Sequence, residues 1–457
     1  MTRRDLLRLA GAACLAMPFT QARADDDAML EALGECLNHH RRFRACFASK
    51  FRSGTCRYDA TAERRLTGKQ VLLLTAMAFG RLAVLSQRQR TGALLYHVRN
   101  GGGMDVFLLG PDGLMKWHRV DADVEALAGG LRHTLSVGVR STTRAMSQFR
   151  RDEPTERALP TDMDQASAAL LPGDLARIIN AEGFQRLLVL PSGPVGQFPF
   201  PALQLGQGRS IAEQASVLHL ADHEALFIDP LDFHGDVEAA LQAMNFDPRH
   251  ALAGAKLLVG NPVFENVDGW ILPPLPGAES EVRAVADVFT GGRVLLGHMA
   301  TRDRIMREMR RFQMDGGIAY FATHGISDPV NPMDGSFLAT ADGAIRGQDI
   351  RRLKMSNAHP LVVMSACQTG LGKTFGGGAY GLARAWYSAG AGQVIGSLWN
   401  VSDEGTSFLM SNFARTLVAN PRSTEEALRL AMLKTRDAFA ADPAIWASFT
   451  VLGNPSA

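Results

Sequence analysis

The chain has 457 residues, 46% of them hydrophobic and 21% charged, with a formal net charge of +2. This composition is typical of folded globular proteins, and the length allows two or three domains. The net charge is too small to indicate the clustered basic surface of a nucleic-acid-binding protein, so we expect no nucleic-acid partner.

The first 24 residues have the pattern of an export signal. Arg3 and Arg4 precede a modest apolar run at 9–19, which is followed by the small-residue site Ala22-Arg23-Ala24. Paired arginines before a weakly apolar run are typical of twin-arginine signals. We expect cleavage after Ala24 and a periplasmic or extracellular location. The alternative is an amphipathic N-terminal helix of a cytosolic protein.

No later stretch has the roughly 18–20 uninterrupted apolar residues of a spanning helix, so we expect no membrane span after signal cleavage. The remaining cysteines are Cys36, Cys46 and Cys56, which are close in sequence, and the distant Cys367. In an oxidising compartment two of the first three can pair, although the sequence does not say which. Cys367 fits a thiol kept free for chemistry, and the alternative is an inert buried residue.

The region 25–90 is predicted to be a small helical segment, with helices at 28–37 and 69–85. Between them, residues 41–57 contain six Lys or Arg and no acid. We interpret this stretch as a solvated face, with a docking surface or processing site as alternatives. The pattern then changes to period two, which predicts a hairpin of 93–98 and 104–109 around a glycine turn, a third strand at 114–120, and helices at 124–135 and 166–180.

From residue 187 onward, short apolar runs alternate with helical stretches, which indicates an α/β sheet with helices on both faces. In such sheets functional residues gather at the carboxyl ends of the strands. The predicted strands are 187–190, 256–259, 294–296, 318–322, 361–365 and 393–398, and the predicted helices between them are 279–289, 302–311 and 380–389.

Two of these strands end in chemically reactive residues. Strand 318–322 leads into Thr323-His324-Gly325, and strand 361–365 leads into Ala366-Cys367. A thiolate is a nucleophile, and a nearby imidazole supplies the base that forms it and later the acid for the leaving amine. We predict a catalytic dyad of His324 and Cys367, with the backbone N–H groups of Gly325 and Cys367 as the oxyanion hole.

Two other kinds of site are weighed and set aside. Gly372-Lys373-Thr374 resembles the end of a phosphate-binding loop, but Cys367 stands where the first glycine belongs, and the glycines at 376–378 cannot open the required helix. His39-His40, and His118 with His133, have no Cys or carboxylate at metal-ligand spacing. We expect these histidines to be solvent-exposed or incidental, and we predict no metal site and no cofactor.

The ordered motifs resemble the CHAT domain, the caspase-HetF-associated-with-TPRs family. The resemblance covers about 91–457 and is densest after 255. It rests on the segments 186–194, 198–203, 272–279, 296–297 with 300–301, 321–325, 362–370, 377–391, 394–403 and 446–449.

The resemblance implies a caspase-like, mostly parallel sheet related to separase and gingipains, with His324 as base and Cys367 as nucleophile. It also implies that 91–250 is a degenerate caspase-like half and that 251–457 is the catalytic part. This chain departs from the family at Gln368 and in the glycine stretch 376–379, where acidic residues are common. The 66 residues at 25–90 are too few for the tandem helical repeats that often precede the domain.

Three functions follow as hypotheses. The first is a cysteine endopeptidase acting on protein or peptide substrates, latent until a partner or processing orders the loops around 376–378. Asp328 and Asp403 are its candidate pocket residues for a basic side chain, although a turn-stabilising role is the simpler interpretation of each. The second is a catalytically silent caspase-like scaffold that binds a peptide or protein. The third, a nucleotide hydrolase, rests only on Gly372-Lys373-Thr374.

Overall fold

The computed structural model describes most of the chain in several ranges. These are 24–53, 65–100, 102–137, 162–227, 244–264, 267, 269–270, 272–312, 316–328, 334–355, 359–366, 373–375, 378–399, 401 and 403–456. The predicted signal at 1–24 therefore lies almost entirely outside the described residues, as do Cys367 and the glycines at 376–377.

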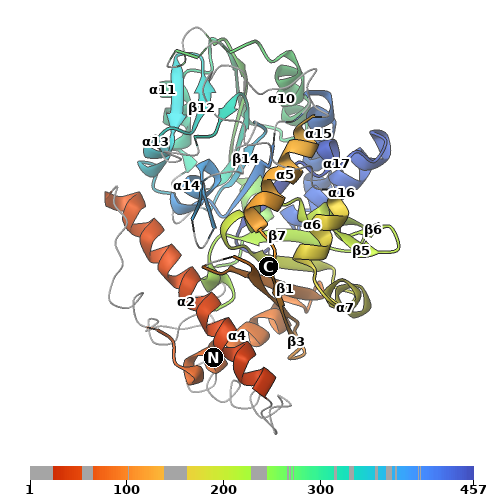
Figure 1. Ribbon diagram of the computed structural model, residues 1–457. Coiled ribbons are helices and arrows are strands. Elements are labelled where there is room, and N and C mark those ends of the chain that lie inside the picture. Colours follow the sequence, from red (N-terminus) through yellow and green to blue (C-terminus); the bar gives the residue numbers. More distant parts are fainter. Residues whose placement is uncertain are drawn as a thin grey trace.

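An eleven-stranded sheet runs through the molecule (Figure 1). Its strand order is β3-β2-β1-β4-β7-β18-β17-β14-β10-β8-β9. The strands are β1 (Thr91–Val98), β2 (Met104–Leu109), β3 (Met115–Val120), β4 (Arg186–Leu190), β7 (Ser216–Leu220), β8 (Ala255–Pro262), β9 (Arg293–Gly297), β10 (Gly317–Ala322), β14 (Leu361–Met364), β17 (Gln393–Ser397) and β18 (Phe449–Gly453).

Most neighbouring strands are parallel. β17, β14, β10, β8 and β9 form one parallel run, and β1, β4 and β7 form another. The predicted hairpin is confirmed, since β1 and β2 pair antiparallel from Ala93↔Leu109 to Val98↔Met104. β18 is antiparallel to β17 and joins the two runs into one sheet.

Helices cover both faces of the sheet, as the alternating pattern predicts. One face packs against α2 (Ala24–Ser53), α4 (Gly68–Leu85), α10 (Pro276–Val288), α15 (Asp403–Ala419) and α16 (Thr424–Ala438). The other face packs against α5 (Val124–Val137), α6 (Met163–Leu170) and α7 (Leu175–Glu182) over the β1–β4 end, and against α11 (Arg302–Met309), α13 (Gly347–Arg351) and α14 (Leu382–Ser388) over the β10–β14 end.

Smaller elements decorate this core. The strands β11 (Gly325–Ile326), β12 (Phe337–Thr340) and β13 (Gly343–Arg346) form a small sheet above β10. The pairs β5 (Gln204–Gly206) with β6 (Arg209–Ser210) and β15 (Lys373–Phe375) with β16 (Gly378–Tyr380) are hairpins. Short helices are η1 (Gly193–Gln197), η2 (Phe200–Ala202), η3 (Ile211–Glu213), η4 (His223–Ala225), α9 (Pro248–Ala253) and α17 (Pro443–Trp446).

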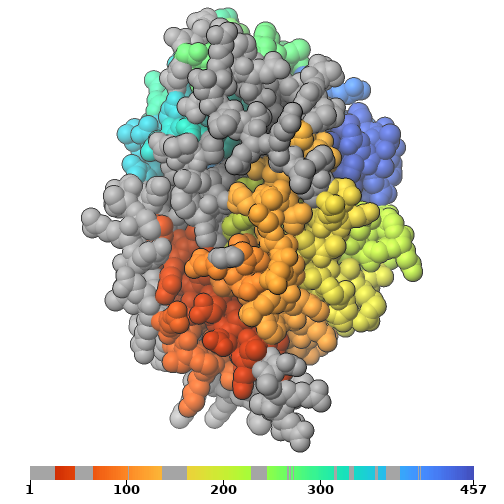
Figure 2. Space-filling view, in the orientation of Figure 1, coloured from red at the N-terminus to blue at the C-terminus, as the bar shows by residue number. Residues whose placement is uncertain are grey.

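The N-terminal region is helical, as predicted, and its two helices lie side by side against β1. Helix α4 starts at a capping box in which Thr67 and Gln70 satisfy each other's backbone N–H groups. Figure 2 shows these red and orange residues forming one continuous surface with the neighbouring strands. Within the described ranges, Gly68–Ser86 is the one helix long and apolar enough to cross a membrane, and 56% of it is buried in the protein, as a packed core helix would be.

Several sequence predictions need correction. The expected helix at 166–180 is two helices, because Pro172 and a left-handed Gly173 (φ 63°) break the chain between α6 and α7. The strands β7, β12, β13 and β18 were not predicted. β7 carries His219 among its apolar residues, and β13 contains Gly343 and Arg346, so neither strand is a continuous apolar run.

The interpretation of the basic stretch at 41–57 as a solvated face is only partly right. Arg41 is 8% exposed, and Arg44 is ion-paired with Asp222 and Glu224. The side chains from residue 47 to the end of α2 lie outside the described set.

A buried arginine joins the first residues of β4 and β17 through a shared glutamate. Arg186 opens β4, and its guanidinium donates to Glu425 Oε1 (3.4 Å), to the Ser456 carbonyl (2.7 Å) and to Thr91 Oγ1 (3.1 Å). Gln393, which opens β17, donates to the same Glu425. Because the Arg186 and Glu425 side chains are 4% and 0% exposed, each charge depends on the other for compensation.

Replacing Arg186 should therefore be costly. We expect Arg186→Leu to lower the free energy of unfolding by about 3–5 kcal/mol, because it leaves the Glu425 carboxylate buried without its cation. Urea unfolding is the measurement. Arg177→Leu, which breaks an exposed pair with Asp174, is the control and should cost less than about 1 kcal/mol. Equal losses in the two variants would contradict the buried network.

His219 on β7 should make stability depend on pH. Burial lowers the pKa of His219 from 6.5 to about 4, and its Nδ1 lies 3.0 Å from Thr450 Oγ1. In the unfolded chain the His219 imidazole is protonated below pH 6.5, whereas in the folded chain it is protonated only below about pH 4. The free energy of unfolding therefore falls as the pH drops through this window.

We expect a contribution of about 1.4 kcal/mol per pH unit from this residue, measured by urea unfolding between pH 7 and about pH 4. His219→Gln should flatten the dependence, whereas replacing the exposed His250 by Gln should leave it unchanged. An unchanged slope in His219→Gln would show that the imidazole titrates alike in both states.

Candidate active site

The two predicted dyad residues follow neighbouring parallel strands. β10 pairs with β14, and the last paired residues are Phe321 and Met364. His324 is three positions beyond Phe321, and Cys367 is three positions beyond Met364. By sequence count, the predicted base and nucleophile therefore follow the last paired residues of the two strands by the same number of positions, and Cys367 itself lies outside the described residues.

His324 is completely buried and held from two sides. Its Nε2 lies 2.9 Å from the Pro273 carbonyl oxygen, and its ring packs against Phe264 with 4.9 Å between centroids. A carbonyl only accepts, so Nε2 carries the hydrogen and donates it. In the neutral imidazole this leaves Nδ1 as the proton acceptor, so this histidine would act as a base through Nδ1.

The backbone around His324 is fixed by β12. Thr323 Oγ1 donates to the Ala339 carbonyl at 2.8 Å, and the Ala339 N–H donates to the His324 carbonyl at 2.9 Å. That second bond flanks the antiparallel pair Gly325↔Leu338. In an antiparallel ladder, pairs that exchange hydrogen bonds alternate with pairs that do not. Gly325 and Leu338 form a pair of the second kind, so the Gly325 N–H points away from β12.

On the nucleophile side, the last described residue before the cysteine is held by a serine that the sequence analysis did not single out. Ser397 is the last residue of β17, and its Oγ donates to the Ala366 carbonyl at 2.6 Å. Both residues are fully buried. The only sequence signal for this contact is a hydroxyl at the end of a strand next to the cysteine strand.

The candidate pocket residues occupy different places. Asp403, the first residue of α15, accepts from the Gly277 N–H with Oδ2 at 3.0 Å and so links α15 to the start of α10. Asp328 packs against Gly335, and its N–H donates to Ser336 Oγ at 2.9 Å. These contacts fit stabilising roles for both carboxylates, and their part in substrate selection stays a prediction. Trp399 belongs to the core, with 1% exposure, and its Nε1–H donates to the Ala444 carbonyl.

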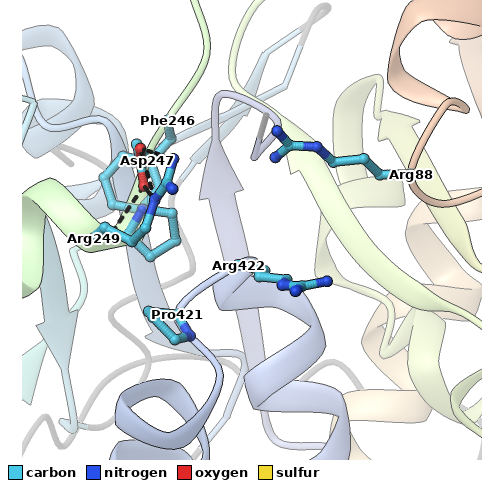
Figure 3. Close-up of a pocket in the computed structure, with 7 residues that line it drawn as sticks. Arg88, Phe246, Asp247, Arg249, Pro421 and Arg422 are labelled. Carbon is cyan, nitrogen blue, oxygen red and sulfur yellow. Dashed lines mark hydrogen bonds and ion pairs between the residues drawn. The ribbon is translucent and has the colours of Figure 1, made fainter.

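The phosphate-loop alternative loses its structural basis. Lys373 and Thr374 lie in β15, which forms a hairpin with β16, whereas a phosphate-binding loop must open a helix. A cavity of about 310 Å³ lies instead at the amino-terminal edge, between Phe246, Pro421, Arg88, Arg249 and Arg422 (Figure 3). Asp247 holds Arg249 there through paired contacts of 2.7–3.1 Å. This cavity is at the opposite edge from His324.

The expectation for the other histidines is partly wrong. His40 is 3% exposed and its Nε2 lies 3.3 Å from the Tyr96 carbonyl, while His118 Nε2 lies 3.1 Å from an Asp174 carboxylate that is distant in sequence. Burial lowers the pKa of His40 well below 6.5. Cys36 precedes His40 by one helical turn, but no set of three or more potential ligands in the described part of the chain is arranged to hold a metal ion.

The N-terminal cysteines differ in state. Cys46 is disulfide-bonded, with its partner outside the described residues. Cys36 is free and buried, and burial raises the pKa of its thiol. Cys36 therefore takes no part in the Cys46 disulfide, and the predicted pairing within Cys36, Cys46 and Cys56 stays a prediction.

Comparison with known proteins gives a family and a fold. The model described as "CHAT domain" matches residues 162–454, which confirms the predicted resemblance, although the match begins later than residue 91. Tetratricopeptide repeat protein 28 of Mus musculus is 27% identical over 237 residues, and that of Homo sapiens is 28% identical. These matches cover 43% of this chain and only 9% of either relative.

Among solved structures, the Saccharomyces cerevisiae separase–securin complex contains a chain with a TM-score of 0.55 and 9% identity, covering 99% of this chain and 36% of that one. The Arg-specific cysteine proteinase gingipain R has a TM-score of 0.42 and 12% identity, covering 73% and 76%. The separase likeness establishes a shared fold and confirms the expected caspase-like architecture.

Proposed function

This chain belongs to the CHAT domain family, and we propose that it is a cysteine endopeptidase with His324 as general base and Cys367 as nucleophile. One observation carries the proposal. Phe321 and Met364 are paired on adjacent parallel strands, and His324 and Cys367 each follow their strand's paired residue by three positions in the sequence. The donation of the His324 Nε2–H to the Pro273 carbonyl supports it, because Nδ1 is then the acceptor.

In this proposal the Cys367 thiol gives its proton to His324 Nδ1, and the thiolate attacks the carbonyl carbon of the scissile peptide. The oxyanion accepts hydrogen bonds from the N–H groups of Gly325 and Cys367. The imidazolium then protonates the leaving amine, which leaves a thioester. Water, deprotonated by His324, hydrolyses that thioester and regenerates the thiol.

We propose further that the free protein is latent. His324 is 0% exposed beneath Phe264 and Pro273, so a substrate reaches the imidazole only after this cover moves. A protein partner or a processing event is the proposed trigger. The likeness to a chain determined in complex with securin fits a protein partner but identifies none. A catalytically silent scaffold that binds peptides or proteins is the second candidate, and the same burial of His324 favours it.

The test is reaction of the purified mature protein with peptidyl electrophiles that carry Arg, Lys, Asp, Asn or Leu at the first position. We expect labelling of Cys367 to fall at least about 100-fold in His324→Ala and to vanish in Cys367→Ala, because an imidazole makes the thiolate. A preference for Arg or Lys that is lost in Asp328→Asn or Asp403→Asn would assign the pocket.

Labelling is measured by mass spectrometry before and after limited proteolysis or incubation with a native extract, which separates latency from inactivity. Cys36→Ala is the control, since that buried thiol has no part in the proposed reaction. Persistent absence of Cys367 labelling under all three conditions would favour the silent scaffold.

We also propose export through the twin-arginine pathway. The pattern of residues 1–24 is the main support, and the disulfide at Cys46 fits an oxidising compartment. In a bacterium with that pathway, the wild type should be found outside the cytoplasm with Asp25 as its first residue. Changing Arg3 and Arg4 together to Lys should leave the unprocessed chain in the cytoplasm, as fractionation and N-terminal sequencing would show. Unchanged export of that variant would contradict the pathway.

A further inference from the structure

The peptide unit between Ala366 and Cys367 has an anchor on one side. The Ser397 hydroxyl donates to the Ala366 carbonyl oxygen at 2.6 Å, and both residues are 0% exposed. Ala366 lies two positions beyond Met364, the last β14 residue paired with β17 through Gly396. The pairing of β14 with β17 thus ends before this peptide. Beyond that point the Ser397 hydroxyl holds the Ala366 carbonyl.

The orientation of one end of a peptide unit fixes the other end. The peptide is planar and trans, so its N–H points away from its C=O on the opposite side of the C–N bond. The carbonyl held by Ser397 belongs to the same unit as the N–H of Cys367. A carbonyl that accepts a strong hydrogen bond also polarises its amide, which makes the N–H a better donor.

We propose that Ser397 is a positioning residue for the oxyanion hole, which turns the Ala366–Cys367 peptide so that the Cys367 N–H faces the developing negative charge. This inference rests on the proposed function of Cys367. In this account Ser397 affects the reaction through the Ala366 carbonyl. It is the counterpart of Thr323, whose hydroxyl bond to Ala339 fixes the backbone on the histidine side.

The sheet offers a matched serine for comparison. Ser448 is 1% exposed, and its hydroxyl donates to the Ile445 carbonyl at 2.8 Å. Its own carbonyl accepts from the Leu398 N–H, next in sequence to Ser397, so it lies at the same end of β17. Its hydroxyl, however, bonds away from Ala366. Replacing either serine by alanine removes a hydroxyl-to-carbonyl bond, which is buried for Ser397 and partly buried for Ser448, but the bond lost in Ser397→Ala is the one to the peptide that precedes the cysteine.

Two reactions of Cys367 separate an oxyanion effect from a general loss of structure. Hydrolysis of a peptidyl ester or amide passes through a tetrahedral oxyanion, whereas alkylation by iodoacetamide is a displacement at carbon that needs only the thiolate. The experiment measures both with the full mature protein, activated as the labelling study requires, for wild type, Ser397→Ala, Ser397→Thr and Ser448→Ala.

We expect Ser397→Ala to lower kcat by about 10–100-fold with little change in KM, because loss of a well-aimed oxyanion donor costs up to about 10²–10³ in kcat. Its alkylation rate and the pH dependence of that rate should match those of the wild type within about twofold. Ser397→Thr, which keeps the hydroxyl, should recover most of the turnover. Ser448→Ala should turn over like the wild type.

Two results would overturn the inference while leaving the peptidase intact. One is equal turnover in Ser397→Ala and Ser448→Ala, which would mean that the bond does not matter to catalysis. The other is a parallel loss of alkylation and turnover in Ser397→Ala, which would mean that the serine supports the loop as a whole. A wild type that neither alkylates at Cys367 nor hydrolyses substrate would overturn the proposed function, and this inference with it.

Discussion

The parallel pairing of β10 with β14 is the constraint on which the rest of the site depends. From Ile318↔Leu361 to Phe321↔Met364, every residue on one strand has a fixed neighbour on the other. A shift of one strand by one residue would move each of its side chains to the opposite face of the sheet. The side chains on each face pack in a different core cluster, so such a shift would break the packing on both faces. The strands thereby set where the segments that lead to His324 and Cys367 leave the sheet.

Beyond the ladder, single hydrogen bonds to backbone carbonyls take over. The Pro273 carbonyl fixes which nitrogen of His324 carries the hydrogen, the Ala339 carbonyl holds Thr323, and the Ala366 carbonyl is held by Ser397. The Thr323 and Ser397 bonds are buried and the His324 bond is partly buried, and the partners are 16 to 51 residues apart in sequence. A site built in this way needs few charged residues, which agrees with the structural contacts of Asp328 and Asp403.

The sequence predicted the parts of the fold that have a strong periodic signal. The hairpin of β1 and β2, the buried strands β10 and β14, and the ordered motifs of the family were readable because each is a continuous run of apolar residues or a specific residue order. The strand β7 was missed because His219 interrupts its apolar run. β18 pairs antiparallel with β17, but α15 and α16 separate the two strands in the sequence. A local sequence pattern does not indicate a partner that is so far along the chain.

The contacts that shape the site could not be predicted for a related reason. Pro273 acts through its backbone oxygen, so its side chain says nothing about the role, and Ser397 is 31 residues from Ala366. His40 looked solvent-exposed because its Tyr96 carbonyl partner is 56 residues away. Sequence patterns report what a side chain prefers, whereas these roles depend on which backbone atoms the folded chain brings near it.

The Arg186 network has a consequence for how such a protein can change over generations. Its buried ion pair closes the amino-terminal edge of the sheet, and His324 lies at the other edge. Substitutions that remove the imidazole or the thiol therefore leave the Arg186–Glu425 network intact. A lineage can lose peptide cleavage and still inherit a folded surface, which makes the descent of silent binding proteins from active enzymes a short step in this architecture.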